Sequence, residues 1–139
     1  MPCGSGVGDD ATSLSAIHLA TQWYDALALG DLDQIRSLIA ADFMMSQTTL
    51  LPWGGTYCGP DGFFEFYLRH FSYLDTQLQV EHIFDAGDRV VQVGVIEGKV
   101  RATGAPVRSR QIDTLELRGG KLTRYVTLVD VPTMLGVVQ

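Results

Sequence analysis

The hydrophobic pattern of the chain changes near its middle, from a helical period to a period of two. In the first half, apolar residues recur at three- and four-residue spacing. From about residue 78 onward, apolar and polar residues alternate. The first spacing is typical of an amphipathic helix and the second of a strand with one buried face. Helices followed by a strand meander predict the α+β class, with the helices on one face of an antiparallel sheet.

The first half predicts three helices and one strand. A polar residue between positions 10 and 13 caps the first helix, and Gly30 ends it, because glycine adopts a left-handed conformation at low cost. Asp31 begins a second helix and Asp61 a third. The third helix carries its aromatic residues largely on one side, at Phe63, Phe64, Tyr67 and Phe71. Phe43 to Thr49 is predicted as a strand, and residues 50–60 as an irregular loop rich in turn formers.

The second half predicts four strands joined by short turns. They are Leu78–Asp85, Arg89–Glu97, Val107–Arg118 and Lys121–Asp130. Strands of this length twist and curve, so we expect a strongly curved antiparallel sheet with the three helices in its concave face and a conical cavity between them. The outer face of such a sheet needs a cover, which predicts a homodimer through the sheet.

Composition narrows the class of protein. The 139 residues carry a net charge of −6 and no basic cluster, which argues against nucleic acid and against an anionic membrane surface as partners. The apolar runs are shorter than the ~20 residues that span a bilayer. Residues 1–10 show no periodic pattern and no signal-peptide pattern, so we expect a flexible tail there and a single domain over residues 11–139. Cys3 and Cys58 are expected to be unpaired thiols of a cytoplasmic protein.

Asp113 is the candidate for chemistry that the pattern singles out. Period two places it on the apolar face of its strand, where a carboxyl group has to be hydrogen-bonded, paired or protonated. Desolvation raises the pKa of such a group and suits it to proton transfer or to donating a hydrogen bond to an oxyanion. The alternative is an acid at the rim of the sheet or one bonded to backbone amides.

His82 is the second candidate. Period two places it between Val80 and Phe84 on an apolar face, and across a pocket from Asp113 it would form a usable base. The alternative is a histidine packed in the core. His18 and His70 lie on predicted helices and are interpreted as surface or packing residues. The histidines show no metal-ligand spacing, so neither a metal nor a cofactor is expected.

Aromatic and sulfur-containing side chains are numerous for a small domain. As a set they suit a cavity for a flat or polycyclic apolar ligand, although each of them could simply belong to the core. The expected lining residues are Trp23, Tyr24, Met45, Trp53, Tyr57, Phe64 and Tyr67. Trp53 is the most pocket-like, because it lies in a glycine-rich loop.

Three runs carry a resemblance to a known family: WYDALALGDLDQIRSLIAADF, WGGTYCGPDGFFEFY and RQIDTLELRGGKLTRYVTLVD. They resemble the nuclear transport factor 2-like superfamily, and within it the SnoaL-like polyketide cyclases and ketosteroid isomerases, over about residues 14–136. The resemblance implies a cone-shaped α+β barrel, commonly a homodimer. It also implies a deep pocket that members use for isomerisation, aldol cyclisation, epoxide opening, dehydration or binding.

The resemblance also implies roles for single positions. Asp113 falls where ketosteroid isomerases place a protonated oxyanion-hole acid. Gln47 occupies the place of their general base, and Trp23, with Tyr24 beside it, the place of their hydrogen-bonding tyrosine. Thr127 stands where many SnoaL-like chains carry an acid.

Asp130 matches the family at the end of the last strand. Because Pro132 follows it closely, Asp130 is interpreted as a helix cap.

The sequence therefore predicts a small-molecule pocket protein. The favoured function is a cofactor-independent cyclase or isomerase that acts by acid/base chemistry on an apolar polyketide-like or steroid-like carbonyl substrate. Asp113 and His82 would be catalytic, and Gln47, Tyr24 and Thr127 would orient the substrate. The alternatives are a non-catalytic module that binds an apolar ligand and an epoxide hydrolase-like enzyme.

Overall fold

Six strands form one curved sheet in the order β2-β1-β6-β5-β4-β3. A computed structural model of the chain describes residues 13–138, so the expected tail over residues 1–10 lies outside the described part. The strands are β1 (Ile39–Gln47), β2 (Gly55–Cys58), β3 (Leu74–Asp85), β4 (Val90–Val100), β5 (Pro106–Arg118) and β6 (Lys121–Val129). The helices are α1 (Ser13–Leu29), α2 (Leu32–Ser37), α3 (Gly59–Tyr73) and α4 (Val131–Val138).

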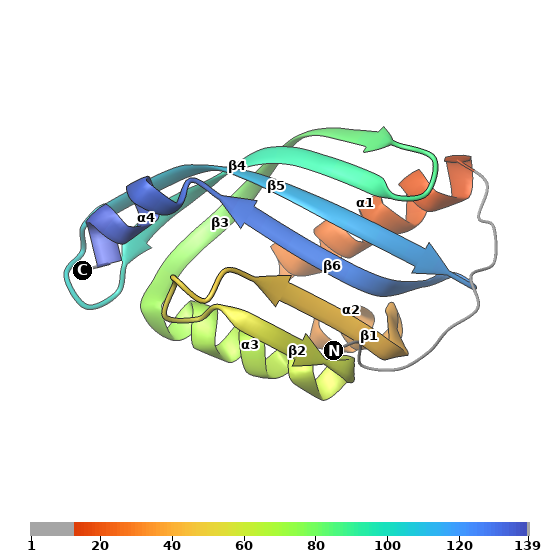
Figure 1. Ribbon diagram of the computed structural model, residues 1–139, viewed down its shortest axis with the longest axis horizontal. Helices are drawn as coiled ribbons and strands as arrows, with labels where there is room; N and C mark the ends of the chain where they lie inside the picture. Colours follow the sequence, from red (N-terminus) through yellow and green to blue (C-terminus); the bar gives the residue numbers. More distant parts are fainter. Residues whose placement is uncertain (1–12, 139) are drawn as a thin grey trace.

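The helices α1, α2 and α3 lie on one side of the sheet, and α4 lies beyond the end of β6 (Figure 1). Helix α3 packs against β1, and α1 packs against β3 and β4. The expected α+β fold with three helices in the concave face of a curved sheet is confirmed. One detail differs, because β1 joins β6 in parallel while the other neighbouring strands run antiparallel.

Local sequence signals at the ends of helices predicted several helix boundaries correctly. Gly30 follows α1 with a φ of 64°, and Asp31 caps α2 by accepting a hydrogen bond from the Gln34 N–H at 3.1 Å. Asp130 caps α4 in the same way, through the Thr133 N–H at 3.2 Å, as predicted. Strand β2 was missed, because the residues expected to form an irregular loop pair antiparallel with the end of β1.

Helix α3 buries a different face from the expected one. Its buried side chains are Phe63, Phe66 and His70, whereas Phe64 is half-buried on the neighbouring side. These three positions follow the i, i+3, i+7 spacing of a helix stripe. The buried stripe shares only Phe63 with the expected set of aromatics and turns toward Phe66 and His70. His70 is a packing residue of this stripe, which is one of the two interpretations given for it.

A β-bulge in β3 changes which side chains face inward. Val80 pairs with Gly94, but His82 pairs with Val93, so Glu81 is an extra residue between them. An extra residue reverses the alternation of side chains from that point on. Consequently His82 lies on the outer face of the sheet, although simple alternation placed it on the inner one.

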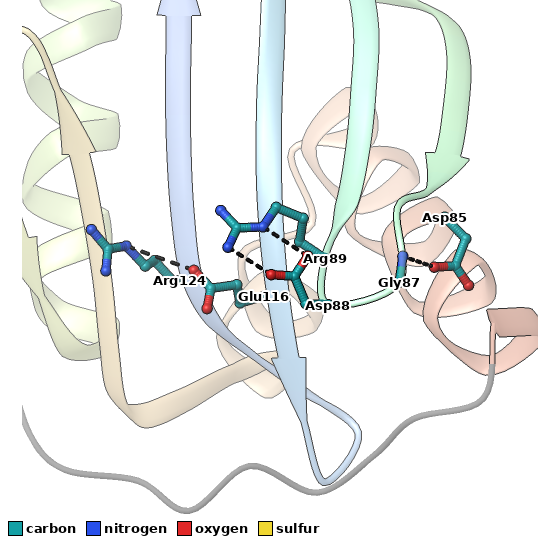
Figure 2. Close-up of polar contacts among 6 residues, drawn as sticks. All are labelled: Asp85, Gly87, Asp88, Arg89, Glu116 and Arg124. Atoms are coloured by element: carbon teal, nitrogen blue, oxygen red, sulfur yellow. Dashed lines mark hydrogen bonds and ion pairs between the residues drawn. The ribbon is translucent and has the colours of Figure 1, made fainter.

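Exposed polar contacts lie at the turn between β3 and β4 and on the outer face of the neighbouring strands. Figure 2 shows three of them: Gly87 with Asp85, Arg89 with Asp88, and Arg124 with Glu116. Ion pairs that stay in water contribute little to stability. These contacts therefore shape the surface and do not take part in the site.

Two sequence expectations bear on the surroundings of the protein. No helix within residues 13–138 is both long and apolar enough to cross a membrane. Cys58 is disulfide-bonded, so the expectation of an unpaired thiol is wrong for this residue, while Cys3 lies outside the described residues.

Candidate functional site

Asp113 is completely buried and accepts hydrogen bonds from four side chains of the described part of the chain. Its Oδ2 accepts from the Tyr24 hydroxyl at 2.7 Å and from the Tyr125 hydroxyl at 3.0 Å. The Gln92 amide donates to the same oxygen at 3.1 Å, and the Gln111 amide donates to Oδ1 at 3.1 Å. Of the two predicted environments, the structure shows the one in the interior, with side-chain donors in place of backbone amides.

The register of the strands explains how this network forms. Asp113 on β5 lies opposite Thr127 on β6 and Gln92 on β4, and all three side chains are buried. Gln47 follows Ser46, which pairs with Val126, so Gln47 lies beside Thr127. The four residues form a row, here called the polar row, that crosses the concave face of the sheet.

Burial and hydrogen bonding act on the pKa of Asp113 in opposite directions. Desolvation is the larger effect and raises the pKa of this carboxyl group above its ordinary value, while the hydrogen bonds from Tyr24, Tyr125 and Gln111 lower it. Burial also raises the pKa of Tyr24 and Tyr125 well above the ordinary value for tyrosine. Both hydroxyls therefore stay protonated and are suited to passing a proton without carrying a charge.

A cavity of about 320 Å³ lies between the helices and the polar row. Tyr24, Tyr125, Gln111 and Thr127 form part of its wall, and Gln47 lies there as well. Its apolar lining includes Phe63, Phe66, Leu78, Ile96, Val129 and Met134. Asp113 itself is not in the wall, because its four donors surround it. The size falls in the range of small-molecule sites.

The predicted lining residues divide into two groups. Tyr24, Gln47, Trp53, Tyr67 and Thr127 lie in the cavity wall.

Trp23, Met45, Tyr57 and Phe64 do not lie in that wall. The Trp23 ring packs edge-on against Phe63 and Tyr125, and Met45 is completely buried. These residues belong to the core or support the wall from behind, as the alternative interpretation of the aromatics allowed.

His82 does not take part in the site. Its side chain is exposed and its ring stacks on Phe84, with 5.6 Å between the ring centroids. The prediction that His82 assists Asp113 across a pocket is therefore corrected, and the bulge at Glu81 is the physical reason.

Several residues of the site were not expected from the sequence. Gln92, Gln111 and Tyr125 donate to Asp113, and His70 lies in the cavity wall. The sequence carries signals for three of them. Alternation by two leads from Asp113 to Gln111 and from Thr127 to Tyr125, and a helix stripe that starts at Phe63 reaches His70.

A curved sheet that encloses helices, an apolar cavity and a buried carboxyl group define a small-molecule pocket protein with a cone-shaped α+β fold. The family model described as "SnoaL-like domain" matches residues 20–125, and the chain belongs to this family. No protein with a curated description matches the chain.

Solved structures share this fold at low sequence identity. An NTF2-like protein of unknown function from Burkholderia pseudomallei is 17% identical with a TM-score of 0.83, and the match covers 90% of this chain and 98% of that one. TerC, co-crystallised with polyporic acid, is 23% identical with a TM-score of 0.80 over 89% of this chain and 98% of that one. A protein described as a SnoaL-like polyketide cyclase, from Shewanella denitrificans, is 22% identical with a TM-score of 0.72, over 89% and 96% of the two chains.

Proposed function

We propose that the protein is a cofactor-independent cyclase or isomerase that moves a proton on an apolar polyketide-like or steroid-like carbonyl substrate. The observation that supports this most strongly is the 2.7 Å hydrogen bond from the Tyr24 hydroxyl, in the cavity wall, to the buried Asp113 carboxyl group. A buried acid with a raised pKa, coupled to the ligand space through one hydroxyl, is suited to acid/base chemistry near neutral pH.

In this mechanism Asp113 acts through Tyr24. The substrate carbon next to the carbonyl group loses its proton to the Tyr24 oxygen, while the Tyr24 proton moves to Asp113 Oδ2. The electron pair of the broken C–H bond becomes an enolate. The Tyr24 hydroxyl never carries a charge, which fits its strongly raised pKa. Gln47 and Thr127, as hydrogen-bond donors in the wall, orient and stabilise the enolate oxygen.

The second half of the reaction decides between the two activities. In an isomerase, the proton returns through Tyr24 to a carbon further along the conjugated system, and Asp113 is ionised again. In a cyclase, the enolate carbon attacks a second carbonyl group of the same substrate, and the proton goes to the alkoxide that forms. Both reactions balance without an oxidant. The isomerase moves one proton and shifts one carbon–carbon double bond, and the cyclase forms one carbon–carbon bond while the π bond of the second carbonyl group breaks and its oxygen takes the proton.

The test separates turnover from binding. With a bicyclic β,γ-unsaturated ketone, conjugation of the product is followed by ultraviolet absorbance, and affinity is measured by calorimetry. Asp113→Asn and Tyr24→Phe should each lower kcat by about 10²-fold or more while affinity changes by only a few-fold. His82→Ala, at an exposed position outside the cavity, serves as the control and should keep both values. Full turnover in Asp113→Asn would overturn the mechanism.

A binding module without catalysis is the second candidate function. The observation that favours it is that Asp113 lies behind its donors and outside the cavity wall, so that it could simply stabilise the fold. Tight binding of apolar ligands with no turnover of any carbonyl or epoxide compound of a test panel, diketones that can cyclise included, would establish this alternative. An epoxide hydrolase-like activity is less well supported, because Gln47 and Thr127 stand beside Asp113 where a second acid would be needed.

Two further proposals concern the setting of the protein. We propose a homodimer through the outer face of the sheet, which carries the exposed side chains of Phe84 and Leu128. The cytoplasmic location stays a prediction, and the disulfide of Cys58 speaks against it, because such bonds are rare in reducing compartments.

A further inference from the structure

A second group of polar side chains lies in the cavity wall away from the Asp113 network. Four buried polar atoms of this wall have no hydrogen-bond partner among the described residues: Trp53 Nε1, His70 Nδ1, Gln47 Oε1 and Thr127 Oγ1. Gln47 and Thr127 belong to the polar row, whereas Trp53 and His70 lie outside it and are neighbours, with 5.3 Å between their ring centroids. Buried polar atoms are normally paired, so this neighbouring pair in the wall of a cavity points to a polar group of a ligand.

The neighbours of His70 set the role of its free nitrogen. His70 Nε2 lies 3.4 Å from the Thr76 hydroxyl, and we assign the Nε2–H as the donor in this contact. The other nitrogen, Nδ1, is then a lone-pair acceptor. Burial lowers the pKa of His70 from 6.5 to about 4, so the ring is neutral at physiological pH. Asp75, also in the wall, is exposed and does not change this assignment.

Trp53 is held firmly in place by its loop. The Arg69 guanidinium donates to the Pro52 carbonyl oxygen at 2.7 Å, and the Tyr57 hydroxyl donates to the Trp53 carbonyl oxygen at 2.7 Å. Arg69 also donates to the Tyr57 hydroxyl at 2.9 Å, which joins the two contacts. The indole N–H is therefore positioned in advance for a ligand, which lowers the entropy cost of binding.

The two groups together specify a hydroxyl group. His70 Nδ1 accepts and Trp53 Nε1–H donates, so the complementary ligand group has to donate and accept at once. A hydroxyl group does both. Among the described residues, no lysine or arginine lies in the cavity wall and Asp75 is acidic, so an anionic group would be bound without a countercharge.

We propose that Trp53 and His70 form a subsite for an uncharged phenolic or enolic hydroxyl group of the ligand. This inference rests on the proposed function of the cavity and adds the class of ligand, a hydroxylated apolar ring compound. Trp53 and His70 act as specificity-determining residues, because they distinguish a hydroxyl group from a methyl group of similar size.

Three naphthalene derivatives test the subsite by calorimetry at pH 7. 2-Naphthol carries the hydroxyl group, 2-methylnaphthalene replaces it with a methyl group of similar size, and 2-naphthoate carries an anion. The wild-type protein should bind 2-naphthol about tenfold more tightly than 2-methylnaphthalene, although the methyl compound is more hydrophobic, and should bind 2-naphthoate more weakly than 2-naphthol. A site that pairs a hydroxyl group rejects an analogue that leaves its polar groups unpaired.

Variants show where the hydroxyl group binds. His70→Phe and Trp53→Phe should each abolish the preference for 2-naphthol over 2-methylnaphthalene. Asp113→Asn, and His82→Ala at an exposed position outside the cavity, should keep it. Circular dichroism checks that each variant is folded. If one subsite variant folds poorly, the other one tests the subsite by itself.

Three results would overturn the subsite. They are equal wild-type binding of 2-naphthol and 2-methylnaphthalene, no wild-type binding of 2-naphthol, and a preference that survives both subsite variants. A preference lost in Tyr24→Phe but kept in both subsite variants would also overturn it, because the hydroxyl group would then bind beside Asp113. Naphthol binding needs no turnover, so failure of the proton-transfer mechanism in Asp113→Asn stays distinguishable from failure of the subsite.

Discussion

Burial changes the acid/base properties of two side chains of this protein in opposite directions. The pKa of Asp113 rises and the pKa of His70 falls, because in both cases the interior disfavours the charged form. Asp113 has four donors around it that offset part of this effect, whereas the Nδ1 atom of His70 has no partner within residues 13–138. At the scale of the residue, the site consists of one compensated acid and one neutral imidazole.

His70 predicts a loss of stability in acid. Its pKa falls from 6.5 in the unfolded chain to about 4 in the folded one, so the folded state binds fewer protons between these values. The stabilising contribution is complete above pH 6.5 and is lost as the pH falls toward 4. At about 1.4 kcal/mol per pKa unit, the loss reaches about 3 kcal/mol.

Urea unfolding at a series of pH values measures this effect. His70→Phe should remove the acid-side slope, while His82→Ala, at an exposed position, should keep the wild-type slope. Asp113 contributes with the opposite sign, because its raised pKa makes its contribution fall as the pH rises, so the comparison is made as a difference between variant and wild type. An unchanged slope in His70→Phe would contradict the prediction.

At the scale of the element, the segment between β1 and β2 positions Trp53 because the chain comes unusually close to itself there. A Cβ atom on Gly54 would lie 1.7 Å from the Thr48 carbonyl oxygen, which no backbone arrangement tolerates unchanged. The Gly54 N–H also donates to the Leu51 carbonyl oxygen at 2.9 Å and closes the turn. Gly54 therefore fixes the backbone position of the preceding residue, Trp53, whose side chain forms part of the subsite.

Two glycine-to-alanine substitutions separate the effect of close backbone approach on stability from the effect of helix propensity. Gly54→Ala should destabilise the protein by about 1–3 kcal/mol, because the added methyl group forces the loop apart. Gly136→Ala, in α4 and with nothing within 4 Å of the added atom, should be neutral or stabilise by up to about 1 kcal/mol. Thermal and urea unfolding measure both variants, and equal effects at the two positions would refute the packing argument.

At the scale of the whole molecule, the sheet has a different role on each face. The polar row and the cavity occupy the concave face. Directly behind it, His82, Val93, Ile112 and Leu128 pair in a row across the outer face. The row is largely apolar and Leu128 is 55% exposed. A face of this kind is suited to a symmetric contact between two copies of the chain.

Leu128→Lys tests the proposed homodimer. A charge at the centre of an apolar contact should convert a dimer into a monomer at micromolar concentration, as measured by light scattering after size-exclusion chromatography. Leu68→Lys, at an exposed position on α3 outside the sheet, is the matched control and should leave the mass unchanged. A wild-type protein that elutes as a monomer at all concentrations would end this proposal.

The order of helices and strands and the inward side of β5 followed from the sequence alone, because both depend on local periodicity. The same periodicity is enough to find Asp113 and the caps at Asp31 and Asp130. It failed at His82, where one inserted residue reversed the alternation, and at β2, whose four residues form a strand through their pairing with β1.

Tertiary structure decided everything that depends on which elements meet. Asp113 receives its donors from α1, β4, β5 and β6, and the distance along the chain from Tyr24 to Asp113 is 89 residues. No local pattern specifies such partners, since hydrogen bonds between elements are fixed only when the sheet curves around the helices. For the same reason the sequence predicted a buried acid, but only the fold placed the neutral imidazole of His70 and the indole of Trp53 in the wall of the same cavity.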